Sequence, residues 1–351
     1  MPALANIKVL IVDDSIFFRK ALEQGLSQDP RIEIVGTAFD SFDAMDKIKK
    51  LCPDVVTLDV EMPKLNGIDF LKQLMPVHPV PVVVVSSAPI RVLDALDAGA
   101  VDFVRKPEAN SAQSLKAFLS ELKVKVKIAS TAKVRKHAQS LPRTAMPALK
   151  SPLLTQNSPV IAIGASTGGT EAILSVVKNL PATTPGIVVV QHMPPVFTKM
   201  YAQRLDRLCQ MHVVEAVHGD RVEQGKIIIG AGEFHLRLAK DAHGYYVKSE
   251  PGEKVSGHCP SVDVLFDSVA DVAGKNAMGV LLTGMGADGA NSLLKMRKAG
   301  AYTVGQDKES CVVYGMPMVA FNIGAVKKQL PLDQIDKEII RFLNAPDSVR
   351  N

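Results

Sequence analysis

The first third of the chain alternates short apolar runs with segments of helical periodicity. The apolar runs begin near residues 7, 32, 54, 81 and 101, and the helical segments begin near Ser15, Ser41, Lys64, Ile90 and Ser111. Strands buried on both faces are apolar throughout, and helices between them connect them in parallel. The pattern therefore predicts an α/β domain, in which helices cover both faces of a parallel sheet.

The same alternation returns beyond the middle of the chain. Apolar runs near 160, 187, 277 and 302 alternate with helical segments, which predicts a second doubly wound parallel sheet. Three short segments, 226–229, 233–238 and 245–248, predict a small antiparallel insertion. A chain of 351 residues is long enough for two separate cores. We expect a first domain over 1–125, a linker over 126–156 and a second domain over 157–351.

A candidate nucleophile lies between a strand and a helix in the second domain. The hexapeptide GASTGG at 164–169 ends a strand, and a helix is predicted over 170–177. A Gly-x-Ser-x-Gly turn at this place raises the serine hydroxyl above the sheet and presents backbone N–H groups to an oxyanion. Ser166 is thus a candidate nucleophile. A phosphate-binding loop or a plain tight turn would also explain the hexapeptide.

Two later strand ends supply partners for this serine. His192 follows the apolar run 186–190, and Asp288 follows the run 277–282, just before a helix predicted over 291–298. Each residue alone has a simpler interpretation, a polar strand-end residue for His192 and a helix N-cap for Asp288. Together they complete a Ser-His-Asp triad, because parallel strands end at one edge of a sheet. The backbone N–H groups near Thr167 and Met285 are candidates for the oxyanion hole.

The chain order of this triad sets it apart from one large fold family. Ser166, His192 and Asp288 follow one another in the order Ser, His, Asp, whereas α/β-hydrolases have the order Ser, Asp, His. The order argues against membership of the α/β-hydrolase fold.

The first domain carries a cluster of carboxylates. Asp13 and Asp14 follow the run 7–12, and Asp59 follows the run 54–58. Three carboxylates at neighbouring strand ends repel one another, which predicts a bound hard cation such as Mg²⁺. Ser86 and Lys106 follow the next two runs and add a hydroxyl and an ammonium to the same edge. This set suits phosphoryl transfer to a carboxylate, because cations neutralise the transferring group.

Residues 7 to about 125 resemble the response-regulator receiver family, which is flavodoxin-like in fold. The matching motifs are VDDS at 12–15, LDVEMP at 58–63, VSSA at 85–88 and FVRKP at 103–107. The resemblance implies that Asp59 accepts the phosphoryl group and that Asp13 and Asp14 hold Mg²⁺ with it. It also implies that Lys106 contacts the phosphoryl group, that Ser86 is the switch hydroxyl and that Phe103 occupies the aromatic switch position. A half-buried sheet residue is the plainer interpretation of Phe103.

Residues from about 157 to 345 resemble the catalytic domain of chemotaxis protein-glutamate methylesterases. The matching motifs are IGASTGG at 163–169, QHM at 191–193 and LTGMGADG at 282–289. The resemblance implies a Rossmann-like serine hydrolase that uses Ser166, His192 and Asp288. The resemblance also implies hydrolysis of glutamate γ-methyl esters on methyl-accepting chemoreceptors and deamidation of receptor glutamines. No cofactor is expected for the esterase reaction. A chemotaxis histidine kinase is the expected phosphodonor, and the unphosphorylated receiver is expected to inhibit.

Composition narrows the remaining possibilities. No apolar stretch reaches the roughly 18 residues that span a bilayer, and the N-terminus lacks a signal-peptide pattern. A cytoplasmic protein without membrane insertion is therefore expected. The net charge is +5, yet residues 123–150 hold eight basic and no acidic side chains. This segment fits a flexible linker. DNA binding is the alternative, but no recognition helix or aromatic platform accompanies the basic segment, so no nucleic-acid partner is expected.

The cysteines do not indicate a metal site. They lie at positions 52, 209, 259 and 311, and none forms a C-x-x-C pair. Two have a histidine nearby, at 212 and 258, but each of these pairs stands alone. Reduced thiols in packed positions are therefore expected rather than zinc ligands.

Overall fold

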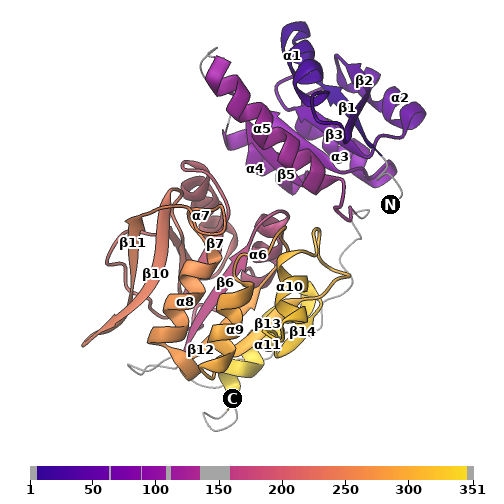
Figure 1. Cartoon of the computed structure of the whole chain (residues 1–351). Coiled ribbons are helices and arrows are strands. Elements are labelled where there is room, and N and C mark those ends of the chain that lie inside the picture. Colours follow the sequence, from indigo (N-terminus) through magenta and orange to yellow (C-terminus); the bar gives the residue numbers. More distant parts are fainter. Residues whose placement is uncertain (1–5, 63–64, 88, 108–111, 135–158, 346–351) are drawn as a thin grey trace. The chain divides into compact units, whose positions relative to one another are not determined.

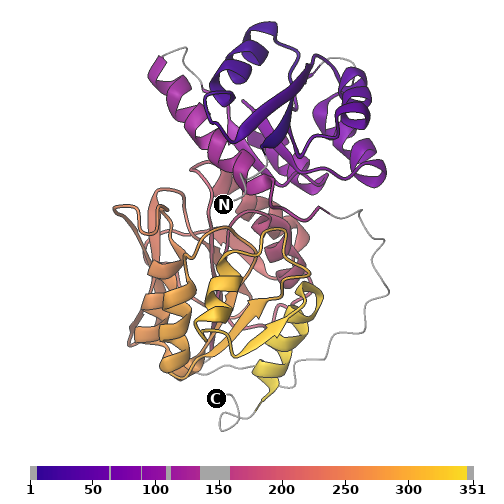
Figure 2. The same ribbon diagram turned by 45° about the vertical axis from the view of Figure 1, so that its right-hand side comes forward.

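The chain forms two compact units, residues 1–142 and 143–351, shown in a computed structural model (Figures 1 and 2). The structure describes residues 6–62, 65–87, 89–107, 112–134 and 159–345. Each unit contains a parallel sheet with helices packed against it. The division between the units falls inside the segment 126–156, for which the sequence predicts a linker, and most of that segment lies outside the described residues.

The first unit is the predicted five-stranded parallel sheet. Its strands are β1 (Ile7–Val12), β2 (Ile32–Ala38), β3 (Val55–Asp59), β4 (Val82–Ser86) and β5 (Asp102–Arg105). Its helices are α1 (Ile16–Leu26), α2 (Ser41–Leu51), α3 (Gly67–Val77), α4 (Pro89–Asp97) and α5 (Ala112–Ala129). The strand order is β2-β1-β3-β4-β5. This order places β1 beside β3, so the acidic ends of these two strands are neighbours.

Side-chain caps at the strand-to-helix turns define this edge of the sheet. The Asp40 carboxylate accepts from the backbone N–H groups of Phe42 and Asp43 at the start of α2. Asn66 caps α3 in the same way, and the Ser15 hydroxyl accepts from Phe18 N–H in α1. Such caps satisfy N–H groups that have no partner within the helix. The strands therefore end, and the helices begin, at sharply defined positions.

The second unit is built around a larger parallel sheet. Its strands are β6 (Val160–Ala165), β7 (Ile187–Gln191), β8 (His212–Glu215), β9 (Lys226–Ile229), β12 (Ala277–Leu281), β13 (Tyr302–Gln306) and β14 (Lys328–Leu330). Their order is β14-β13-β12-β6-β7-β9-β8. The α-helices are α6 (Gly169–Val177), α7 (Phe197–Leu208), α8 (Val262–Val272), α9 (Ala290–Lys298), α10 (Met316–Asn322) and α11 (Leu332–Asn344), with a 3₁₀ turn η1 (Gly274–Asn276).

The predicted antiparallel insertion has two strands instead of the three that the sequence indicated. Among the strands of the described residues, β10 (Phe234–Asp241) and β11 (Gly244–Pro251) alone pair antiparallel, and β10 packs against α8. The prediction that the segment 226–229 belongs to the insertion is wrong. This segment forms β9, which lies in the main sheet and runs parallel to β7 and β8. Its buried residues Ile227, Ile228 and Ile229 suit a covered parallel strand. A short apolar run does not reveal its pairing partner, and β8 and β14 were not predicted.

The last helix of the first unit extends into the predicted linker. α5 continues to Ala129, whereas the sequence predicts that the linker begins at residue 126. Val126 and Ala129 are fully buried, so packing against the sheet favours helix over these residues. None of the described helices combines the length and apolar composition that crossing a membrane requires.

The register of the second sheet brings three strand ends together. Ala165 at the end of β6 lies opposite Gln191 at the end of β7, and Leu281 at the end of β12 lies opposite Gly164. The residues that follow these strands therefore emerge side by side at the carboxyl edge of the sheet. Ligand and catalytic sites of open α/β sheets gather at this edge.

The buried face of α8 offers a direct test of the second core. Phe266 is fully buried among residues of the sheet and of α8, whereas Phe321 on α10 is 49% exposed. We expect Phe266→Ala to lower the free energy of unfolding by about 3–5 kcal/mol, because it leaves a cavity. Phe321→Ala is the matched control and should change it by about 0.5 kcal/mol or less. Guanidinium unfolding followed by circular dichroism measures both, and similar losses would contradict this account of the core.

Candidate active site and acidic cluster

Ser166 follows β6 directly and is held in place through its backbone. Its N–H donates to Thr283 O at 3.0 Å, and its carbonyl accepts from Gly169 N–H and from Gln191 Nε2. Gly284 leaves room for this approach, because a Cβ on Gly284 would lie 2.7 Å from Ser166 Cβ. The loop after β12 therefore presses against the Ser166 turn.

His192 lies between the two other predicted triad residues. It follows β7, and its Nδ1 is 3.1 Å from Ser166 Oγ while its Nε2 is 2.7 Å from Asp288 Oδ2. Its side chain is only 7% exposed. With the proton on Nε2, that nitrogen donates to Asp288 and Nδ1 accepts from the Ser166 hydroxyl. The three side chains predicted from separate strand ends thus form one hydrogen-bonded chain.

Asp288 is a buried carboxylate with four hydrogen-bond donors. Besides His192, it accepts from Ser261 Oγ, from Val262 N–H at 2.7 Å and from Asp263 N–H at 3.0 Å. Burial alone would raise the pKa of Asp288, but the hydrogen bonds, led by that of His192, outweigh burial and hold the pKa well below its ordinary value. Asp288 therefore stays ionised at neutral pH.

Asp288 caps a different helix from the one that its position in the sequence indicates. The simpler interpretation made Asp288 the N-cap of the helix that follows it, α9, but the cap position of α9 is Gly289 and no side chain caps it. The carboxylate instead binds the first N–H groups of α8, whose own cap residue Ser261 makes no capping bond. The partial positive charge of a helix N-terminus favours an anion there.

One oxyanion candidate follows Ser166 directly, and the other lies in the loop after β12, which contacts Ser166. Thr167 is the next residue, and its carbonyl accepts from the Thr283 hydroxyl at 3.0 Å, which ties its turn to the loop after β12. Met285 follows Gly284 in that loop and is 45% exposed. Within the described part of the chain, the Met285 N–H has no protein acceptor. Both backbones thus lie next to the Ser166 turn.

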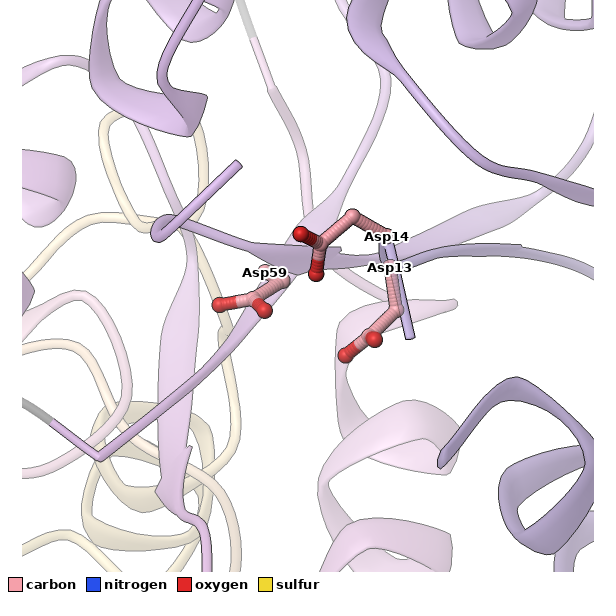
Figure 3. A group of neighbouring side chains, drawn as sticks. All are labelled: Asp13, Asp14 and Asp59. Atoms are coloured by element: carbon pink, nitrogen blue, oxygen red, sulfur yellow. The ribbon is translucent and has the colours of Figure 1, made fainter. Parts of the chain in front are cut away.

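The acidic cluster of the first unit gathers as predicted. Figure 3 shows Asp13 and Asp14 at the end of β1 and Asp59 beside them on β3. One carboxylate oxygen from each lies within 4.8 Å of the others. Asp13 and Asp59 are buried, and Asp14 is exposed. Oxygen atoms of this kind and spacing fit a hard divalent cation.

Lys106 bridges the two buried carboxylates. Its Nζ lies 2.6 Å from Asp59 Oδ2 and 2.8 Å from Asp13 Oδ2. Burial lowers the pKa of Lys106, but the charges of Asp59 and Asp13 outweigh burial and raise it above its ordinary value. Burial raises the pKa of Asp13 despite the Lys106 bond. The ammonium thus offsets the repulsion between the two carboxylates.

The two predicted switch residues lie on the adjacent strands. Ser86 is the last residue of β4, next to the position where Val85 pairs with Asp59. Phe103 on β5 is 4% exposed and therefore buried rather than half-buried. The Lys125 Nζ lies 4.8 Å from the centroid of the Phe103 ring and donates to its carbonyl. The Phe103 side chain is thus buried, with the Lys125 ammonium against its ring.

Two residues that hold the triad were not predicted. Gln191 donates from Nε2 to the carbonyl of Ser166, and Ser261 donates to Asp288. Ser261 precedes the apolar periodic run of α8, which is a helix-start signal, but that signal does not reveal the distant Asp288. For Gln191, which precedes His192, no sequence pattern indicated a contact with Ser166.

Comparisons with known proteins agree with both halves of the chain. The CheB methylesterase family matches residues 161–339, and the response regulator receiver domain family matches residues 9–127. A protein-glutamate methylesterase/protein-glutamine glutaminase 2 of Syntrophomonas wolfei is 54% identical over 97% of this chain and 99% of its own length. A protein-glutamate methylesterase/protein-glutamine glutaminase of Salmonella typhimurium is 44% identical over 99% of this chain and 100% of its own.

A solved structure supports the second unit. The crystal structure of the Thermotoga maritima CheB methylesterase catalytic domain covers 52% of this chain and 98% of its own, with a TM-score of 0.51 and 37% identity. The family match, the full-length relatives and this fold agree. The chain belongs to the CheB methylesterase family, and it carries a response regulator receiver domain ahead of its methylesterase domain.

Proposed function

We propose that this chain is a phosphorylation-regulated serine esterase that hydrolyses glutamate γ-methyl esters on chemoreceptors and deamidates receptor glutamines. The observation that carries the proposal is the hydrogen-bonded chain from Ser166 through His192 to Asp288, in a member of this family. A loop that binds a nucleotide phosphate gives no reason for a histidine and a buried carboxylate beside the serine.

The geometry supports an acyl-enzyme mechanism. His192 Nδ1 takes the proton of the Ser166 hydroxyl as Oγ attacks the ester carbonyl, and Asp288 stabilises the imidazolium through Nε2. The N–H groups of Thr167 and Met285 are the proposed donors to the oxyanion. His192 then gives the proton to the leaving oxygen of the ester, which departs as methanol, or to the amide nitrogen of a glutamine, which departs as ammonia. Water, activated by His192, releases the glutamate carboxylate.

The domain division belongs to the same proposal. A receiver over 1–125 receives the phosphoryl signal, residues 126–156 link it to the esterase, and residues 157–351 hold the catalytic chemistry. A chemotaxis histidine kinase is the proposed phosphodonor, and a methyl-accepting chemoreceptor is the proposed substrate. The cytoplasmic location remains a prediction.

The acidic cluster supports phosphorylation of the receiver at Asp59. The carboxylates of Asp13, Asp14 and Asp59 fit Mg²⁺, because they offer three oxygens within 4.8 Å of one another. When bound, the ion would neutralise charge on the incoming phosphoryl group. Lys106 already contacts Asp59 and is the proposed protein cation for a phosphoryl oxygen. Ser86 is the proposed switch hydroxyl and Phe103 the proposed aromatic switch.

The triad is tested by substitution of its members. We expect Ser166→Ala, His192→Ala and Asp288→Asn each to lower kcat by on the order of 10³-fold or more, without additive losses, because the residues act as a unit. Methanol release from methylated receptor measures turnover, and circular dichroism checks folding. An organophosphate should label Ser166 in the wild-type chain alone. Near-normal turnover by folded Ser166→Ala would remove Ser166 from the nucleophile role.

Phosphorylation is tested by intact mass after treatment with acetyl phosphate. We expect a phosphoryl adduct that requires Mg²⁺ and that is lost in Asp59→Asn, because Asp59 belongs to the proposed metal site and contacts Lys106. Asp54→Asn is the matched control, since Asp54 precedes the opposite end of β3 and accepts from Lys8 N–H. An undiminished adduct on Asp59→Asn would place the acceptor elsewhere.

Regulation is tested by removing the receiver. A tethered domain acts at high effective concentration, so even weak inhibition by the unphosphorylated receiver is effective. We expect a chain that begins at Ser151 to have higher basal esterase activity than the full chain and no response to acetyl phosphate. Equal basal activities would argue against inhibition, and lower activity after truncation would indicate a receiver that activates.

A further inference from the structure

A second histidine lies flat against the proposed general base. The imidazole of His258 stacks on that of His192, with ring centroids 3.6 Å apart and planes only 10° from parallel. His258 is half-buried and comes from the segment between β11 and α8, far from β7 in the sequence. The mechanism proposed above gives this ring no role.

The triad hydrogen bonds restrain one motion of His192 only weakly. Ser166 Oγ and Asp288 Oδ2 bind the two ring nitrogens, Nδ1 and Nε2, and hydrogen bonds to ring nitrogens lie near the plane of the ring. Two such bonds fix where the nitrogens lie. They resist less strongly a tilt of the ring about the line that joins these atoms. A flat group packed on the ring face opposes this tilt directly.

The chain presents His258 on a short, well-defined turn. Val255 and His258 exchange both of their backbone hydrogen bonds, at 3.0 and 2.9 Å. Ser256 has φ 52° and Gly257 has φ 84°, as in the two central residues of a type I′ turn. The Ser256 hydroxyl donates to Asp263 Oδ2 at 3.0 Å, which ties the tip of the turn to α8. The turn is thus anchored at its base and at its tip.

The same segment also holds the triad carboxylate. A few residues after His258, the Ser261 hydroxyl and the N–H groups of Val262 and Asp263 bind Asp288. Residues 255–263 therefore contact two members of the triad, His192 through a ring face and Asp288 through hydrogen bonds. This arrangement aligns the base with its carboxylate from a single piece of chain.

We propose that His258 is a positioning residue, which holds the His192 ring in the plane that aims Nδ1 at Ser166 and Nε2 at Asp288. The inference rests on the esterase function proposed above. The planar face of His258 is what acts, and neither its proton nor a contact with substrate is required. The role therefore concerns kcat, because a tilted base transfers the serine proton less well while substrate binding is unaffected.

The test compares substitutions that keep or remove the flat face. We expect His258→Ala to lower kcat for methylated receptor by about 10- to 100-fold, with KM changed by about twofold or less. His258→Phe keeps a planar ring and should restore kcat to within about threefold of wild type. His243→Ala is the matched control, because His243 lies in the turn between β10 and β11, and it should leave both constants unchanged.

A spectroscopic readout tests positioning without any substrate. The proton that His192 Nε2 shares with Asp288 should give a low-field proton NMR signal, which disappears in His192→Ala. We expect this signal to persist in His258→Phe and to broaden or vanish in His258→Ala. If the wild-type chain has the signal but releases no methanol, the proposed function fails while the positioning role is still tested.

A variant of the turn addresses the case in which His258→Ala does not fold. Gly257→Ala leaves the His258 side chain intact but strains the turn, because an L-residue rarely adopts φ 84°. Gly244→Ala imposes the same kind of strain in the turn between β10 and β11, also with open space around it. We expect Gly257→Ala, but not Gly244→Ala, to lower kcat and broaden the signal.

Three outcomes would overturn the proposal. Wild-type kcat and an unchanged signal in His258→Ala would show that the stack does not position the ring. A loss in His258→Phe as large as in His258→Ala would show that the imidazole acts through its nitrogens. A change in KM alone would place His258 in substrate binding.

Discussion

The buried carboxylate of Asp288 is the constraint on which the catalytic half depends. By general estimates, removing an ionised group from water costs about several kcal/mol unless charge partners and hydrogen bonds replace the lost solvent. Asp288 obtains them from two backbone N–H groups of α8, from Ser261 and from His192. These four donors come from two segments far apart in the sequence. Satisfying one charge therefore fixes α8 and β7 relative to the loop after β12.

The same network sets the direction of the proposed proton transfer. Because hydrogen bonds hold the pKa of Asp288 far below neutrality, the carboxylate remains an acceptor and keeps the His192 proton on Nε2. Nδ1 is then the nitrogen that faces Ser166. The backbone of Ser166 is bound in turn by Thr283, Gly169 and Gln191, so the proposed nucleophile is also held by groups other than the His192 side chain. Both partners of the proposed proton transfer are therefore positioned in the absence of a substrate.

In the receiver, the buried carboxylates are stabilised in a different way. Asp13 and Asp59 have Lys106 between them, and a single ammonium offsets two buried carboxylates. Asp14 is exposed and adds a third carboxylate at the same edge. A cluster with this excess of negative charge favours a cation, whereas the Asp288 site is complete within the protein. The acidic cluster is therefore suited to reversible binding of a ligand, and the Asp288 site to a permanent geometry.

The sequence by itself determined the local features: buried strands as apolar runs, and the reactive residues that follow them. Apolar runs and helix starts depend on nearby residues, so the sequence was enough to place six side chains at strand ends: Ser166, His192, Asp288, Asp13, Asp59 and Lys106. Only the tertiary structure decided the order of the strands, and it put β9 in the main sheet instead of the insertion. It also decided that Asp288 caps α8 and that His258 covers His192. Such contacts join residues dozens of positions apart, and they follow from strand order and register, which no local pattern encodes.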